Sequence, residues 1–96
     1  MKQQATLTIT GRVQGVFYRS ETQKMAQKLG LSGYVKNNAD GSVTAVAQGD
    51  EIRLKQFIEW CKKGPEGAAV DKVITTRQPH KGLFTGFEIQ SHPFLT

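Results

Sequence analysis

The run GRVQGVFYR over residues 11–19 carries the residue types best suited to binding an anion. Gly11 and Gly15 follow an alternating strand pattern, and Arg19 stands at the start of a helical pattern. Backbone N–H groups in such a loop and in the first helical turn have no intrahelical partner, so they are available to an anion. Arginine adds a planar pair of donors that matches two phosphate oxygens. The run therefore predicts a phosphate-binding loop with Arg19 as its cation.

This loop needs a strand before it and a helix after it, and the flanking patterns supply both. Alternation of apolar residues with threonines predicts a strand over about residues 5–13. A helix is expected to start near Ser20, where Ser20 and Gln23 fit a capping box, and to end at Gly30 in a left-handed cap. The spacing i, i+3, i+4, i+7 indicates one buried stripe on this helix, formed by Thr22, Met25, Ala26 and Leu29.

The rest of the chain reads as strands around a second helix. Further strands are expected at about residues 32–38, 42–48, 70–77 and 84–90, and Asp-Gly at 40–41 predicts a hairpin between the first two. The second helix is expected between its N-cap Asp50 and the Gly64-Pro65 stop, with a buried stripe of Leu54, Phe57, Ile58 and Cys61. The order is βαββαβ plus a C-terminal strand. It predicts an α+β, ferredoxin-like two-layer sandwich, in which two helices lie on one face of an antiparallel sheet.

The predicted topology brings the end of the second strand toward the phosphate loop. In a split βαβ unit the first two strands run parallel, so their carboxyl ends and the start of the first helix share one edge of the domain. A third strand lies between them and separates them by roughly 10 Å. Asn37 ends the second strand and shares the apolar face of Val35 by the two-residue period. A polar amide on that face favours a specific hydrogen-bonding role, such as holding a water beside a bound phosphate.

Two motifs together resemble the acylphosphatase signature. The first is GRVQGVFYR at 11–19, followed by Thr22, and the second is LSGYVKN at 31–37, followed by DGSV at 40–43. Further matches extend along nearly the whole chain, at Gly49, Phe57, Gly64-Pro65, Ala69, Val70 and Phe87-Glu88-Ile89. Many members of this family end soon after the last strand, often near a tyrosine, whereas this chain continues to Thr96.

The resemblance implies a metal-independent acylphosphatase, which hydrolyses the carboxyl–phosphate anhydride of acyl phosphates to a carboxylate and inorganic phosphate. It implies catalytic roles for Arg19, which would bind the phosphoryl oxygens, and for Asn37, which would orient the attacking water. It places phosphate binding, largely through backbone amides, at Gln14, Gly15, Val16, Phe17, Tyr18 and Arg19. No cofactor is implied, and inorganic phosphate or sulfate is expected to fit the site. The motifs do not specify the acyl group of the physiological substrate.

Length and composition bound the remaining expectations. Ninety-six residues suit a single domain over residues 1–96, with 91–96 either packing Phe94 on the sheet or forming a tail. The net charge of +5 suggests an anionic partner, but the scattered basic residues favour a solvated surface over a nucleic-acid-binding stripe. No apolar run approaches the ~20 residues of a membrane span, and no basic-then-apolar signal opens the sequence. The lone cysteine, Cys61, agrees with a reducing compartment, so a cytoplasmic location is expected. A monomer is expected because the domain is small and has no evident apolar patch.

Two alternatives belong to other functional classes. RNA-recognition domains share the βαββαβ order, but they stack bases on aromatic residues of their central strands, and residues 42–48 contain none. A phosphate-sensing domain without turnover would keep the loop, and Asn37 makes that alternative less attractive. His80, His92 and Cys61 have no sequence partner at a metal-ligand or triad spacing, so no metal site is predicted.

Overall fold

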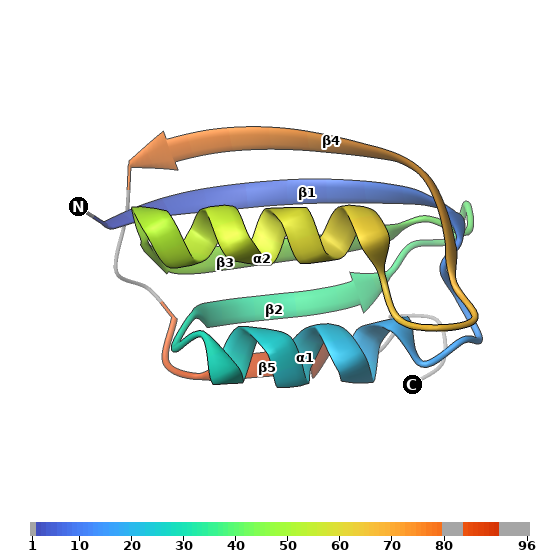
Figure 1. Cartoon of the computed structure of the whole chain (residues 1–96), viewed down its shortest axis with the longest axis horizontal. Helices are drawn as coiled ribbons and strands as arrows, with labels where there is room; N and C mark the ends of the chain where they lie inside the picture. The colour runs from blue at the N-terminus through green and yellow to red at the C-terminus, as the bar shows by residue number, and fades with distance from the viewer. Residues whose placement is uncertain (1, 80–83, 91–96) are drawn as a thin grey trace.

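Two helices cover one face of a five-stranded sheet (Figure 1). The computed structural model describes residues 2–79 and 84–90. The predictions for His80, His92 and residues 91–96 lie outside the described residues. Along the chain the elements are β1 (Lys2–Arg12), α1 (Tyr18–Lys28), β2 (Ser32–Asn37), β3 (Val43–Asp50), α2 (Glu51–Lys63), β4 (Ala69–Pro79) and β5 (Phe87–Gln90).

The strands are arranged in the order β4-β1-β3-β2-β5. As predicted, β3 lies between β1 and β2 and pairs antiparallel with both, and β1 also pairs antiparallel with β4. These strands confirm the ferredoxin-like fold. The final strand differs from the antiparallel prediction, because β5 pairs parallel with β2. Since β4 ends at the edge of the domain where β2 begins, a strand that continues the chain beside β2 runs in the direction of β2. The complete sheet is therefore mixed.

The first helix begins earlier than predicted and lacks the predicted capping box. Its N-cap is Phe17, which adopts the left-handed backbone conformation at φ 62°. Ser20 therefore lies inside the first turn, and its Oγ donates to Phe17 O at 3.2 Å instead of accepting a bond from an amide. The Gln23 side chain also points elsewhere, because its Nε2 donates to Phe87 O in β5 at 2.9 Å. The left-handed residue, not a serine side chain, marks the start of α1.

The other helix ends follow the sequence signals. Gly30 adopts the predicted left-handed conformation at φ 71°, and Leu31 N donates to Ala26 O at 2.9 Å, which completes a Schellman-type cap. Asp50 caps α2 as predicted, because its Oδ1 accepts a hydrogen bond from Ile52 N at 2.7 Å. These caps set the points at which α1 gives way to β2 and β3 gives way to α2.

Both helices bury the predicted stripes against the sheet. The predicted α2 residues, together with Thr22 and Ala26 of α1, are buried, and Met25 and Leu29 pack against the core at its margin. The inward residues of β1 face this layer and are fully buried, namely Ala5, Leu7 and Ile9. Burial of a large aliphatic or aromatic side chain contributes about 1.5–3 kcal/mol, so these stripes hold the helices on the sheet. No helix within the described ranges is long and apolar enough to cross a membrane.

A buried hydroxyl joins the start of α1 to the end of α2. Tyr18 Oη donates to Cys61 O at 2.7 Å, and the Tyr18 ring lies 5.9 Å from the Trp60 ring between centroids. In a longer helix the Cys61 carbonyl would accept a bond from the amide of residue 65, but Pro65 has no N–H. Tyr18 therefore satisfies a carbonyl that the end of α2 would otherwise leave unpaired.

Replacement of Tyr18 with phenylalanine is expected to lower the free energy of unfolding by about 1–3 kcal/mol, because the buried Cys61 carbonyl loses its donor. Urea unfolding measures the change. Tyr34→Phe is the matched control, since it removes the same atom from a half-buried ring that packs on Phe84. Equal stability losses in the two variants would contradict the role of the Tyr18 hydroxyl.

Burial also shifts the titration of this pair. Desolvation raises the pKa of the Cys61 thiol from 9.0 to about 12, although the bond with Tyr18 partly opposes the shift. Desolvation, and secondarily the neighbouring Cys61, raises the pKa of the Tyr18 hydroxyl far above its usual value. Both groups stay neutral in the folded chain at a pH that ionises them in the unfolded chain. Their contribution to stability is therefore complete below pH 9, where both groups are neutral in either state. For the thiol it declines as the pH rises from about 9 to about 12.

The thiol contribution predicts a smaller alkaline loss of stability in Cys61→Ala. Between pH 7 and pH 10 the native chain is expected to lose about 1.4 kcal/mol more unfolding free energy than the variant, since the variant has no thiol to ionise on unfolding. Urea titrations of both chains at the two pH values test this expectation. Parallel losses in the two chains would show that the buried thiol does not carry the effect.

Candidate functional site

A cavity of about 260 Å³ lies where the ends of β1 and β2 meet the start of α1. Its volume is slightly below the roughly 300–1,000 Å³ of pockets for drug-sized ligands, so it suits a smaller one. The residues that line it come from the loop after β1, from α1, and from the ends of β2 and β5: Val13, Gly15, Phe17, Tyr18, Arg19, Ser20, Asn37 and Ile89.

Asn37 reaches this cavity because it is the last residue of β2. It pairs with Val43 of β3, which in turn pairs with Ile9 of β1, so the three residues form one row across the sheet. The Asn37 Oδ1 atom is buried and has no hydrogen-bond partner within residues 2–79 and 84–90. An unpaired buried acceptor is unfavourable by about 1–3 kcal/mol. The buried Oδ1 is thus an unfavourable feature of the free protein, at a residue that lines the cavity.

The loop between β1 and α1 leaves a series of backbone donors outside the helical hydrogen-bond pattern. Val13 is buried and anchors the loop, while Gly15 at φ 75° and Phe17 at φ 62° turn it through the left-handed region. The first helical bond runs from Glu21 N to Phe17 O at 3.0 Å, so the amides of residues 18–20 precede it. These amides lie at the positive end of the helix dipole, which favours a bound anion.

Arg19 adds a full positive charge to the same end of α1. Its half-buried side chain lines the cavity, and Nη1 donates to Gln90 O at the end of β5 at 3.3 Å. A cation in the first turn of a helix interacts unfavourably with the helix dipole unless an anion lies nearby. The position of Arg19 thus favours the same ligand as the backbone amides.

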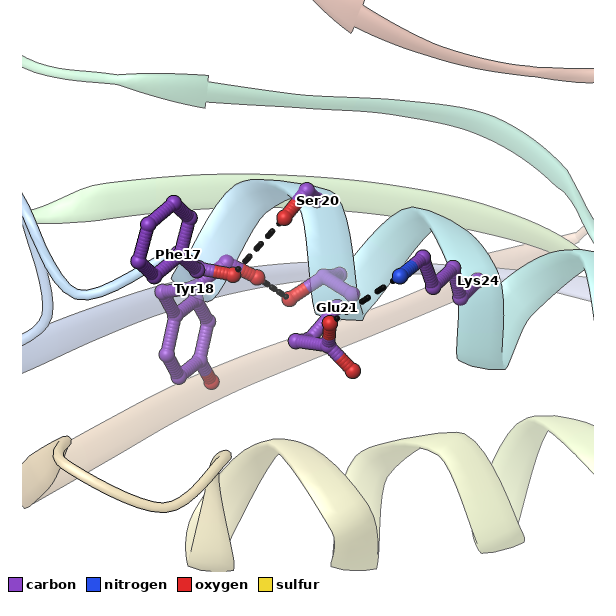
Figure 2. Close-up of polar contacts among 6 residues, drawn as sticks. Phe17, Tyr18, Ser20, Glu21 and Lys24 are labelled. Atoms are coloured by element: carbon purple, nitrogen blue, oxygen red, sulfur yellow. Dashed lines mark hydrogen bonds and ion pairs between the residues drawn. The ribbon is translucent and has the colours of Figure 1, made fainter.

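The structure brings most of the predicted site residues together. Five of them line the cavity, namely Gly15, Phe17, Tyr18, Arg19 and Asn37. The other two do not line it, since the Gln14 side chain is bonded to the β2–β3 hairpin and Val16 packs against the core. Figure 2 shows the start of α1, where the Tyr18 ring points toward α2 and the Phe17 ring lies beyond the first turn.

The side chain of Gln14 has a bracing role that sequence reasoning missed. Its Nε2 donates to Asn38 O at 2.8 Å and to Ser42 O at 2.9 Å, both in the hairpin that follows Asn37. The amide therefore joins the loop after β1 to the strand end that carries Asn37. Its partners lie 24 and 28 residues farther along the chain, so no local pattern could have indicated these bonds.

The hairpin that receives Gln14 is itself held by a polar network. Asp40 Oδ1 accepts bonds from Ser42 Oγ at 2.6 Å and from Ser42 N at 2.9 Å. Asn38 Nδ2 donates to Ser42 Oγ at 2.9 Å and to Thr44 Oγ1 at 2.8 Å. The hydroxyl of Ser42, and then its amide, hold the pKa of the Asp40 carboxyl below its usual value. The predicted Asp-Gly turn is thus a fixed support next to Asn37.

Three lining residues were not predicted as site residues: Val13, Ser20 and Ile89. The alternation of Phe87 and Ile89 was the one available signal, because it placed both on the helix-covered face of the last strand. Within the described residues, no three His, Cys, Asp or Glu side chains gather in a way that could hold a metal ion.

Taken together, these groups can hold a tetrahedral anion and a water. Backbone amides and the Arg19 guanidinium supply donors and positive charge, and Asn37 brings a side-chain amide to the same cavity. Donors that match phosphate oxygens and an amide that can orient a water are the parts needed for hydrolysis at phosphorus.

Comparison with known proteins identifies the family. The acylphosphatase family model matches residues 5–89. The chain is 51% identical to the acylphosphatase of Lactobacillus johnsonii, with 88% of this chain and 93% of that protein covered. It is 43% identical to the acylphosphatase of Geobacter sulfurreducens, with 94% and 99% covered. The crystal structure of the Bacillus subtilis acylphosphatase superposes with a TM-score of 0.89 at 35% identity, over 92% of this chain and 98% of that chain.

The relatives do not favour the phosphate-sensing and nucleic-acid-binding alternatives. Both the sequence and the fold agree with the resemblance that the two motifs indicated. The chain belongs to the acylphosphatase family, as an enzyme that hydrolyses acyl phosphates.

Proposed function

We propose that hydrolysis takes place in the cavity between the loop after β1 and the end of β2. The phosphoryl group is bound by backbone amides of residues 14–19 and by the Arg19 guanidinium. The attacking water is held by Asn37. The observation that carries this proposal is that one cavity brings together Asn37, Arg19 and the start of α1 from separate elements.

The amides and Arg19 act on the charge that the transition state places on the phosphoryl oxygens. In the transition state the transferring phosphoryl group carries negative charge on three equatorial oxygens. Fixed donors stabilise this charge without reorganising during the reaction. Arg19 is held by Gln90 O before the substrate binds, so little side-chain freedom is lost when the phosphate arrives. Two loop residues in the left-handed conformation, Gly15 and Phe17, fix the direction of the backbone around the anion.

Asn37 acts on the water by position. Its side-chain amide forms a hydrogen bond with the water, which directs a lone pair of the water oxygen at phosphorus. Breakage of the P–O bond releases a carboxylate, which needs no protonation near neutral pH. The proton of the water passes to an oxygen of the phosphate product. The reaction thus requires neither a dedicated base nor a bound metal ion, and we expect turnover in excess EDTA.

We further propose that the chain works as one domain, as a monomer in the cytoplasm, without a cofactor or a nucleic-acid partner. The buried, unpaired thiol of Cys61 is compatible with a reducing compartment.

Asn37→Ala is expected to lower kcat for acetyl phosphate by about 10²–10³-fold, with little change in KM, since the variant loses a group that positions the water. Steady-state hydrolysis in excess EDTA measures both constants. The affinity for inorganic phosphate serves as the control, because it reports whether the loop and Arg19 remain intact. An unchanged kcat would contradict the water-orienting role.

Arg19→Ala is expected to raise KM, to lower kcat/KM by about a hundredfold or more, and to weaken inhibition by inorganic phosphate, since it removes the cation of the site. Arg19→Lys should recover part of the loss, because it keeps the charge but not the planar pair of donors. Arg77→Ala, on β4 near the opposite end of the sheet, is the control. Arg19→Ala with native phosphate affinity would overturn the assignment.

A further inference from the structure

Phe17 is placed in an unfavourable way that the phosphate-binding role does not require. It is the one non-glycine residue within the described ranges that has a positive φ, and its side chain is 80% exposed. Left-handed backbone is disfavoured for a bulky residue, and an exposed aromatic ring gains nothing from burial. Loop amides need only the backbone at this position, for which glycine or asparagine would be less strained.

The backbone around Phe17 is nonetheless held firmly. Its carbonyl accepts bonds from Ser20 Oγ at 3.2 Å and from Glu21 N at 3.0 Å (the Ser20 bond is drawn in Figure 2). The next side chain, Tyr18, points inward and is bonded to Cys61 O. Because neighbouring side chains diverge at this turn, the buried Tyr18 fixes the Phe17 ring on the outside of the first turn.

Ile89 provides a second exposed apolar side chain at the same cavity. It pairs with Val35 of β2 and therefore lies on the same face as Asn37, two residues farther along that strand. Its side chain is 38% exposed. Within the described residues, the large apolar side chains that remain exposed are Phe17, Ile52, Ile74 and Ile89, and two of these four line this cavity.

We propose that Phe17 and Ile89 bind the acyl group of the substrate and make the enzyme selective for acyl phosphates with an extended apolar acyl chain. This inference rests on the proposed function. One bridging oxygen joins the acyl carbon to phosphorus, so the acyl chain starts within the same cavity and can lie along its wall. Phe17 and Ile89 are the solvent-exposed apolar side chains of that wall. An apolar chain that covers both side chains removes their surface from water, and an acetyl group is too short to do so.

Hydrolysis of acetyl phosphate and of hexanoyl phosphate tests the proposal. The two leaving carboxylates have nearly equal basicity, so their intrinsic reactivity is similar and the ratio of kcat/KM reports contacts with the chain. The native enzyme is expected to favour hexanoyl phosphate by about tenfold. Phe17→Asn and Ile89→Ala should each reduce this preference about threefold or more, mainly through KM for hexanoyl phosphate. Asparagine is chosen at residue 17 because it tolerates left-handed backbone.

Ile74→Ala is the matched control for Ile89→Ala, since Ile74 is an exposed isoleucine of β4 that does not line the cavity. It should leave both substrates unaffected. Equal kcat/KM for the two substrates in the native enzyme would overturn the acyl-binding role while leaving the proposed function intact. So would an unchanged preference in Ile89→Ala, which decides the matter even if Phe17→Asn disrupts the loop. Turnover of neither substrate by the native chain would overturn the proposed function and the acyl-binding role with it.

Discussion

The hydrogen bond from Tyr18 to the Cys61 carbonyl is the contact on which the rest of the site depends. Pro65 leaves that carbonyl without a backbone donor, and the side-chain hydroxyl of the first residue of α1 donates to it instead. With Tyr18 fixed inward against α2, the residues on either side of it are directed outward, Phe17 at the rim of the cavity and Arg19 within its wall. A bond that looks like a detail of helix packing therefore sets the direction of the groups that bind the substrate.

The site also shows how stability and chemistry are divided. Among the residues that the structure describes, the Asn37 Oδ1 is buried without a partner, and Phe17 is held in a strained conformation, so both lower the stability of the free protein. The supporting residues around them are by contrast well paired. Gln14 joins the loop to the hairpin with two bonds, and Ser42 is held by Asp40. The two unfavourable groups persist at the site because the hydrogen-bonded residues around them hold the backbone in this arrangement.

Much of the fold could be predicted from sequence because its signals are local. The helix stripes, the Gly30 cap and the Asp50 cap each depend on residues within a few positions of one another. Asn37 could be placed near the loop because strand topology alone brings the two together. The helix start was predicted wrongly, since a left-handed phenylalanine is not a sequence signal and Ser20 resembles a cap. The Gln14 bonds and the parallel pairing of β5 join distant segments, so no local pattern could indicate them.

The order of strands in the sheet has a consequence for how the molecule is made. β1 forms its two ladders with β3 and with β4, and the second of these pairs Thr8 with Ile74 and Gln3 with Pro79. Pairings between such distant segments slow the folding of the whole domain. During synthesis β1 and the loop after it leave the ribosome long before β4. Arg19 can contact Gln90 only after β5 has also emerged. The segment that carries the chemistry is synthesised before the strands that hold it, so we expect a nascent chain to acquire its activity only after β4 and β5 have emerged.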